Sequence, residues 1–177
     1  MRKKLLAVLL TVILMIGVIS LTGCNNNTDN SSTEVVNNTE NEIKTTMSFY
    51  HETYLFKSKK SVEYIIYLNE NNKLIKLGYI EKYYEFTDDN DYKIISEGAP
   101  EEAELNNRTY SYLNETVDVN QESKEVTITD LYDVSKVESR SKLPFNEIKD
   151  NLNDEFIFNL ENYKNTMTGK GYTCKEK

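Results

Sequence analysis

An apolar stretch at the N-terminus determines how much of this 177-residue chain is left to fold. The stretch covers residues 5–21 and follows three cationic side chains, Arg2, Lys3 and Lys4. A basic start followed by an apolar run is the layout of a secretory signal peptide, which is removed from the mature protein. A retained transmembrane anchor is the alternative, because the stretch is close to the shortest that can span a membrane.

The end of the stretch distinguishes these two interpretations. Its last residues resemble the lipobox of bacterial lipoproteins: Leu21, Thr22, Gly23 and Cys24. In a lipobox, small residues enter the signal-peptidase groove and the cysteine thiol receives a diacylglyceryl group. The resemblance implies that residues 1–23 are cleaved off and that a lipid on Cys24 holds the protein at the cell membrane, facing outside the cytoplasm. Two acyl chains make such an anchor stable.

Residues 24–42 are predicted to be the lipidated cysteine followed by a flexible tether. The tether is rich in Asn, Ser and Thr and has too few apolar residues to order itself. The whole chain is acidic, with 29 acidic and 21 basic residues and a formal net charge of −8. An acidic chain repels phosphate backbones, so we expect no nucleic-acid partner.

Residues 43–177 are predicted to form a single domain that opens with three strands. Residues 44–57, 62–68 and 73–86 alternate aromatic or branched side chains with polar ones, which is typical of strands. Residues 58–60 and 69–72 are polar and are predicted as the turns between them. The segment therefore predicts an antiparallel meander.

A helix is predicted to start within residues 98–102. Pro100 has no backbone donor to leave unpaired in a first turn, and the two glutamates after it favour the positive end of the helix dipole. Ala103, Tyr110 and Leu113 are predicted to share its buried face. The alternative is that residues 100–113 are partly strand, because polar and apolar residues alternate toward their end.

The rest of the pattern completes an α+β domain. Residues 116–121 and 125–133 predict a hairpin, and residues 144–152 predict a helix with apolar residues on one face. A last helix is predicted to start at Asn159, with a terminal strand at Tyr172 and Cys174 after a glycine stop at 169 or 171. The expected fold is an antiparallel sheet (meander, helix, hairpin) with C-terminal helices packed on one face.

This order of elements resembles small bacterial lipoproteins with a YehR-like domain of unknown function. The resemblance is carried by the lipobox, the long opening strand pair, the segment EVTITDLYDVSKV at residues 125–137 and the ending MTGKGY at residues 167–172. It implies the same fold and an extracytoplasmic location for most of residues 43–177. Because that family has no assigned activity, the resemblance implies no catalytic residue.

Few side chains suggest catalysis. His51 is the one histidine, and Cys174 is the one thiol besides Cys24, so neither a zinc-site spacing nor a disulfide framework is present in the sequence. We expect His51, within a predicted strand, to be an ordinary surface or rim residue and Cys174 to pack under the last helix. The alternative is an envelope enzyme that uses Cys174 or His51.

Two further groups of residues suggest binding. Asp88, Asp89 and Asp91 could bind calcium through their oxygens, but the segment lacks the glycine and glutamate of an EF-hand loop, so a solvated acidic turn is preferred. Six tyrosines are predicted on neighbouring strands, and the exposed face of that sheet is the candidate recognition surface. They are Tyr64, Tyr67, Tyr79, Tyr83, Tyr84 and Tyr92.

The sequence therefore predicts a lipid-anchored, non-enzymatic binding or accessory module of the bacterial envelope. We expect no metal and no cofactor. Its partners besides the membrane would be an envelope protein or a small ligand of unknown identity. The alternatives are the envelope enzyme and a calcium-dependent binder that uses residues 88–91.

Overall fold

The computed structural model describes residues 42–55 and 58–177. The predicted signal peptide, the lipobox with Cys24 and nearly all of the tether lie outside the described residues. Within the described part of the chain, no helix is both long and apolar enough to cross a membrane.

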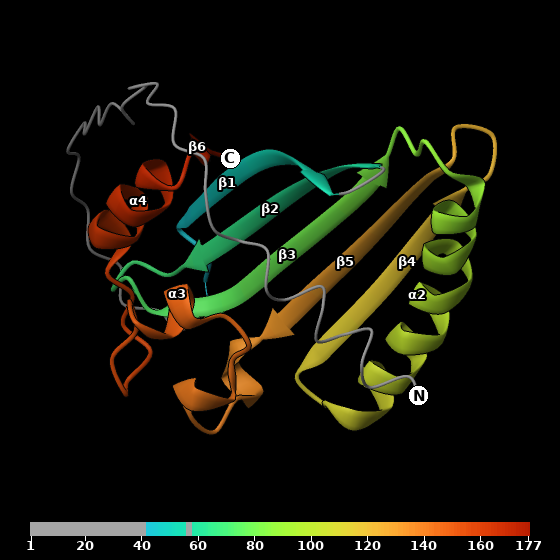
Figure 1. Cartoon of the computed structure of the whole chain (residues 1–177). Coiled ribbons are helices and arrows are strands. Elements are labelled where there is room, and N and C mark those ends of the chain that lie inside the picture. The colour runs from blue at the N-terminus through green and yellow to red at the C-terminus, as the bar shows by residue number, and fades with distance from the viewer. Residues whose placement is uncertain (1–41, 56–57) are drawn as a thin grey trace.

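The described residues form a six-stranded antiparallel sheet in the order β4-β5-β3-β2-β1-β6 (Figure 1). The strands are β1 (Thr45–Leu55), β2 (Ser58–Leu68), β3 (Leu74–Tyr84), β4 (Leu113–Asn120), β5 (Glu125–Asp133) and β6 (Thr173–Glu176). The helices are α2 (Asp89–Thr109), α3 (Asn146–Lys149) and α4 (Leu160–Gly169), with short 3-10 turns η1 (Val134–Lys136) and η2 (Arg140–Lys142). The predicted α+β class is confirmed, including the meander, the hairpin and the C-terminal helices.

One row of directly paired residues crosses the sheet and shows which side chains share a face. From β4 to β6 its members are Glu115, Asp130, Tyr79, Tyr64, Phe49 and Cys174. At one end Asn106 of α2 donates a hydrogen bond to the Glu115 carboxylate, and at the other Tyr163 of α4 packs edge-on against Phe49. The helices α2 and α4 therefore cover the same face at opposite ends of the sheet (Figure 1).

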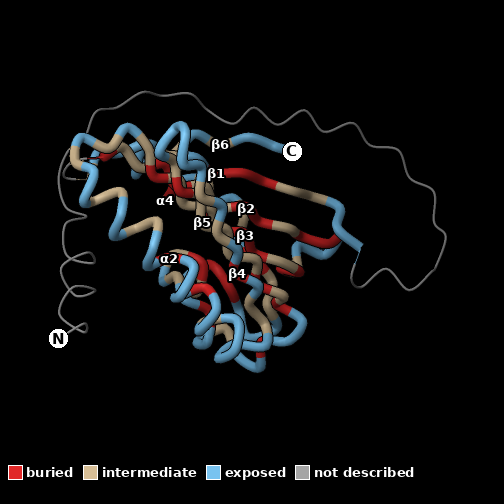
Figure 2. Tube along the Cα trace, turned by 90° about the vertical axis from the view of Figure 1, so that its right-hand side faces the viewer, coloured by how far each residue is buried: buried red, intermediate tan, exposed pale blue. Residues whose placement is uncertain are grey.

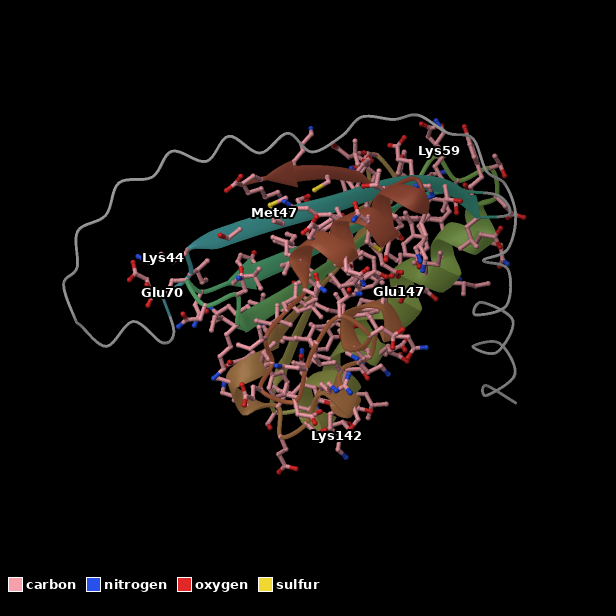
Figure 3. The ribbon with its side chains drawn as sticks, turned by 90° about the vertical axis from the view of Figure 1, so that its left-hand side faces the viewer. Lys44, Met47, Lys59, Glu70, Lys142 and Glu147 are labelled. Atoms are coloured by element: carbon pink, nitrogen blue, oxygen red, sulfur yellow. The ribbon has the colours of Figure 1, made fainter. Side chains whose placement is uncertain are left out.

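A buried apolar cluster joins the sheet to the C-terminal segment. Met47 of β1, labelled in Figure 3, belongs to it together with Tyr163 and Met167 of α4. Figure 2 shows the buried positions concentrated in the strands at the centre of the fold. The fully buried residues of this apolar cluster are Phe49, Ile66, Leu68, Leu74, Leu77, Leu143 and Ile148, together with Tyr163 and Met167. This cluster fixes the C-terminal segment on the sheet.

The predicted start of the middle helix is wrong. The helix begins at Asp89, because the Asp88 side chain accepts a hydrogen bond from the Asn90 backbone N–H, 2.9 Å away, and caps the first turn. Pro100 therefore lies inside α2. The Ala103 prediction is confirmed, but Tyr110 is the C-cap residue of the helix and Leu113 begins β4.

Two other boundaries also differ from the prediction. Residues 58–60 are not a turn, because β2 already begins at Ser58, which pairs with Leu55. The helix predicted over 144–152 shortens to Asn146–Lys149, because the Arg140 guanidinium donates hydrogen bonds of 2.8 Å to the carbonyl oxygens of Lys149 and Leu152. These carbonyls are thus satisfied without a further helical turn.

Several local predictions are confirmed. The turn at 69–72 contains Asn72 at a φ of 57°, in the left-handed region that asparagine tolerates. Asn159 caps α4 by accepting a hydrogen bond from the Asn162 backbone N–H at 3.1 Å. Gly171, at a φ of 86°, provides the left-handed turn after α4 that leads into β6.

Candidate functional site

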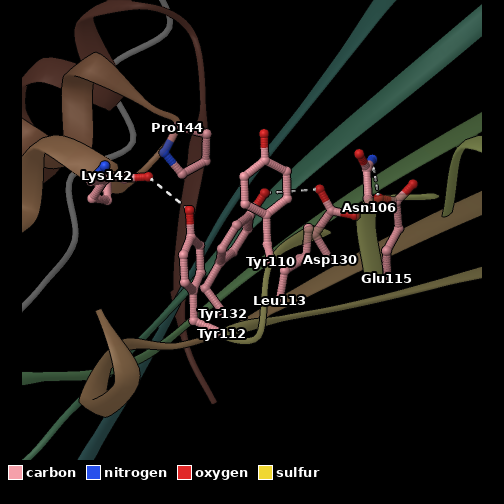
Figure 4. Close-up of a pocket in the computed structure, with 9 residues that line it drawn as sticks. All are labelled: Asn106, Tyr110, Tyr112, Leu113, Glu115, Asp130, Tyr132, Lys142 and Pro144. Carbon is pink, nitrogen blue, oxygen red and sulfur yellow. Dashed lines mark hydrogen bonds between the residues drawn. The ribbon is translucent and has the colours of Figure 1, made fainter. Parts of the chain in front are cut away.

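A pocket of about 290 Å³ opens on the covered face of the sheet, between the C-terminal end of α2 and the segment that contains η2. We call it the tyrosine–acid pocket (Figure 4). Its lining residues are Asn106, Tyr110, Tyr112, Leu113, Glu115, Asp130, Tyr132, Lys142 and Pro144. Figure 4 shows the three tyrosines together on one side, and the two carboxylates with Asn106 on the other.

The aromatic wall consists of Tyr110, Tyr112 and Tyr132. The ring centroids of Tyr110 and Tyr112 are 5.7 Å apart, and those of Tyr112 and Tyr132 are 6.5 Å apart. The Tyr112 hydroxyl donates to the carbonyl oxygen of Lys142 at 3.4 Å, which connects the wall to the η2 segment. Tyr110 is 43% exposed, so part of this wall faces solvent.

The acidic side of the pocket consists of Glu115 and Asp130, which are directly paired residues on β4 and β5. Glu115 is buried, and its Oε2 accepts a hydrogen bond of 2.7 Å from Asn106 Nδ2. Asp130 Oδ2 accepts a hydrogen bond of 3.2 Å from the Tyr132 hydroxyl. Asp130 Oδ1 is buried and has no hydrogen-bond partner among the described residues.

Burial raises the pKa of both carboxyls. Burial is the main cause of the shift that brings the pKa of Asp130 to about 7, and the negative charge of Glu115 adds to it. Burial likewise raises the pKa of Glu115, although the hydrogen bond from Asn106 opposes this shift. Asp130 therefore exchanges a proton near neutral pH, and the charge of the pocket depends on pH.

Three partly buried glutamates elsewhere on this fold have an ammonium partner, whereas these two carboxylates do not. Glu81 is paired with Lys60, Glu63 with Lys177 at 2.6 Å and Glu147 with Lys170 at 2.7 Å. Among the described residues, neither Glu115 nor Asp130 takes part in an ion pair. The two carboxylates of the pocket are thus not ion-paired in the described part of the protein, although Lys142 also lines the pocket.

The surroundings of the pocket are also acidic. The segment 88–109, which contains α2 and its N-cap, carries seven acidic and two basic side chains. One of them, Glu102, is close enough to contribute to the raised pKa of both Glu115 and Asp130. The electrostatic potential on this side of the protein therefore favours cations.

A second hollow, of about 480 Å³, lies between the β2–β3 turn and residues 155–157. Asn69, one of its lining residues, is engaged in holding the β2–β3 turn. Asn69 Oδ1 accepts hydrogen bonds of 2.9 Å from the backbone N–H groups of Asn71 and Lys73. We therefore regard the tyrosine–acid pocket as the candidate site.

His51 and Cys174, the residues of the predicted enzyme alternative, lie away from this pocket near the β1–β6 edge. His51 Nδ1 is 3.2 Å from the Gly171 carbonyl oxygen, and its ring is 4.9 Å from that of Tyr172. Cys174 pairs with Phe49 and packs against the apolar cluster under α4. Both side chains thus contribute to the contact of β1 with the C-terminal segment.

The three aspartates predicted as a weak calcium site lie at the N-terminal end of α2. Asp88 caps α2, Asp89 pairs with Lys124 at 2.6 Å, and Asp91 lies in the first turn of the helix. In the part of the chain that the structure describes, no group of three or more His, Cys, Asp or Glu side chains is placed to hold a metal ion. The predicted acidic turn is therefore the beginning of a helix.

The predicted tyrosine surface divides between the two faces of the sheet. Tyr64 and Tyr79 belong to the row on the covered face, and Tyr83, which pairs with Lys60, is on that face too. Tyr67 and Tyr84 are on the opposite face, whereas Tyr92 lies in α2. The tyrosines that line the pocket were missed by the strand pattern, because two of them follow α2 in a short connection.

The carboxylates of the pocket were missed as well, although the sequence contains a signal for them. The predicted hairpin began at residue 116, one position after Glu115. At the turn of the hairpin Asn120 pairs with Glu125. Counting five residues away from the turn along each strand places Glu115 opposite Asp130. Two acids that face each other in a hairpin are unusual and could have been noticed.

No protein-family model matches this chain, and no curated protein matches it. The chain is similar to the NMR structure of a protein from Streptococcus pneumoniae TIGR4. The two share 16% sequence identity with a TM-score of 0.47, over 88% of this chain and 99% of that one.

Proposed function

We propose that this protein is a lipid-anchored binding module of the bacterial envelope, and that it binds its ligand in the tyrosine–acid pocket. The anchor is supported by the sequence Leu21 to Cys24 and the basic, apolar segment before it. The binding role is supported by the pocket itself, in which three tyrosines face two carboxylates that have no ammonium partner among the described residues. Concave sites with a few convergent polar groups are the usual places for ligands.

The pocket carries this proposal because its composition reduces stability. A directly opposed pair of acids destabilises a sheet, and a buried carboxylate oxygen without a partner adds to the cost. Groups with strongly shifted pKa values are concentrated at functional sites in proteins. A bound ligand that contacts these groups would offset the lost stability for as long as it occupies the pocket.

The anchor is tested by replacing Cys24 in the producing bacterium. The wild-type protein should incorporate labelled palmitate and lose residues 1–23, whereas Cys24→Ala should incorporate no palmitate. Cys174→Ala is the matched control and should behave as wild type. If the wild-type protein takes up no palmitate and keeps residues 1–23, the retained transmembrane segment is the correct interpretation.

The binding role is tested with the Cys24→Ala chain from which residues 1–23 have been removed. Its amide NMR spectrum is recorded against a library of small polar and charged compounds. Hits should shift the resonances of residues 110–115 and 130–132, and Tyr112→Ala should abolish the shifts. Hits that map only to other regions would contradict the assignment of the site.

A further inference from the structure

We propose that the tyrosine–acid pocket recognises an organic ammonium group, such as the end of a lysine side chain or a small alkylammonium ligand. This inference rests on the proposed binding role and adds the chemical class of the ligand. It is argued from the charge of the site, its aromatic wall, its size and its proton equilibrium.

The charge argument depends on the pairing of the carboxylates: Lys142 also lines the pocket, but among the described residues no cationic side chain forms an ion pair with Glu115 or Asp130. Glu115 and Asp130 both line the pocket, and their hydrogen-bond partners, Asn106 and Tyr132, are neutral. Elsewhere on the same sheet face Lys60 neutralises Glu81 within the fold. A ligand cation would neutralise the charge of Glu115 and Asp130 in the same way that Lys60 neutralises Glu81.

The aromatic wall favours an organic cation. The faces of tyrosine rings attract ammonium groups, and several rings around one position strengthen this attraction. Tyr110, Tyr112 and Tyr132 form a continuous series of rings in the pocket, and Leu113 and Pro144 add apolar contact area. Such a wall suits an ammonium group with carbon substituents.

The size of the pocket also favours an organic ligand over a bare metal ion. A volume of about 290 Å³ accommodates several carbon atoms. Calcium takes six to eight oxygen ligands at close range. In the described part of the chain the pocket contributes only two carboxylates, and they do not belong to a group suited to a metal.

Binding should be coupled to the protonation of Asp130. The charged and titratable groups around this side chain come from every element that packs against it. They are Glu115 on β4, Tyr132 on β5, Tyr79 and Glu81 on β3, Glu102 on α2 and Lys142 at the end of η2. A cation stabilises the ionised carboxylate, so binding should release a proton and should tighten as the pH rises from 6 to 8.

The test is an NMR titration of the Cys24→Ala chain that lacks residues 1–23. The two titrants are n-butylammonium chloride and n-butanol, its neutral counterpart of similar size. We expect n-butylammonium to shift the amide resonances of residues 110–115 and 130–132 with millimolar affinity, and n-butanol to bind at least about tenfold more weakly. Equal affinity for both compounds would overturn the ammonium inference and leave the proposed binding role intact.

Variants identify the groups responsible. Asp130→Asn and Glu115→Gln should each weaken n-butylammonium binding about tenfold at pH 8. Asp130→Asn should also remove the change in affinity between pH 6 and pH 8. Asp118→Asn, which neutralises an exposed acid on the opposite face of β4, is the matched control and should bind as wild type. A wild-type affinity in both pocket variants, with melting curves that show them folded, would overturn the inference.

Discussion

Glu115 and Asp130 lie directly opposite each other on β4 and β5, on the sheet face that α2 covers. Opposed like charges destabilise an antiparallel pair, so at least one of the two is protonated over part of the physiological pH range. Asp130, whose pKa is raised to about 7, is that residue. The stability of the fold therefore depends on pH through a residue that lines the pocket.

The first prediction concerns the pH dependence of stability in Asp130→Asn. Unfolded Asp130 has its ordinary pKa of 3.8, and folded Asp130 has a pKa of about 7. Between these values the unfolded chain loses the proton and the folded chain keeps it, so rising pH lowers the stability of the wild type through this residue. Asparagine cannot ionise, so the variant should gain stability relative to wild type by a few kcal/mol between pH 4 and pH 8.

Urea denaturation at pH 4, 6 and 8 measures this difference. Asp118→Asn removes an exposed acid from the same strand pair and serves as the control. It should show no comparable trend. A constant difference between Asp130→Asn and wild type across this range would contradict the assignment of the raised pKa to Asp130.

The second prediction concerns the ion pair of Lys60 and Glu81. Their side chains are only 15% and 16% exposed, and Glu81 also accepts hydrogen bonds from the hydroxyls of Tyr79 and Tyr83. Lys60→Met leaves the Glu81 charge partly buried without its counterion, which should lower the free energy of unfolding by about 3–5 kcal/mol. Lys124→Met breaks the exposed pair with Asp89 and should cost less than about 1 kcal/mol. Equal losses in the two variants would contradict the argument.

The third prediction concerns the hydroxyl of Tyr163. This residue is fully buried, and its hydroxyl has no hydrogen-bond partner among the described residues. Tyr163→Phe keeps the ring contacts with Phe49 and Phe158, so stability should be unchanged or higher by up to about 1 kcal/mol. Tyr83→Phe is the control, since it removes a hydrogen bond of 2.9 Å to Glu81 and should lower stability. A loss in Tyr163→Phe as large as in the control would show that the hydroxyl has a partner.

The fourth prediction concerns Asn107, whose side-chain amide forms two hydrogen bonds with the backbone of the edge strand β4. Its Oδ1 accepts from the Glu115 backbone N–H at 2.7 Å, and its Nδ2 donates to the Glu115 carbonyl oxygen at 2.8 Å. Asn107→Ala should lower the free energy of unfolding by about 1–2 kcal/mol. Asn165→Ala, at an exposed position of α4, makes the same change of helix propensity and should have little effect. Thermal melts of the two variants provide the comparison.

The sequence predicted well where local chemistry decides the structure. Asn159 caps a helix, Asn72 occupies a left-handed turn and Gly171 ends the last helix, as expected. Alternation along the strands predicted the meander and the hairpin. The middle helix was placed too far along the chain because proline fits a first turn better than an interior, and because Asp88, which caps the helix, was assigned to an acidic turn.

The spacing of small and apolar residues within that helix could have shown that it starts before Pro100. Ile95, Ala99 and Ala103 recur every four residues, which is a single helical stripe across Pro100. The candidate site could not be predicted in the same way. Its wall joins residues after α2, a β5 tyrosine and Pro144 of a distant segment, so it depends on how the C-terminal segment packs on the sheet.

The strand order has a consequence for how the pocket meets its surroundings. The chain enters the sheet at β1, and the pocket lies three to four strands away, over β5 and β4. At a strand spacing of about 4.8 Å, this places the two roughly 14–19 Å apart across the sheet. In the lipid-anchored protein that we propose, attachment and recognition therefore occur toward opposite ends of the strand order, so a bulky partner can approach the pocket without crowding the tether.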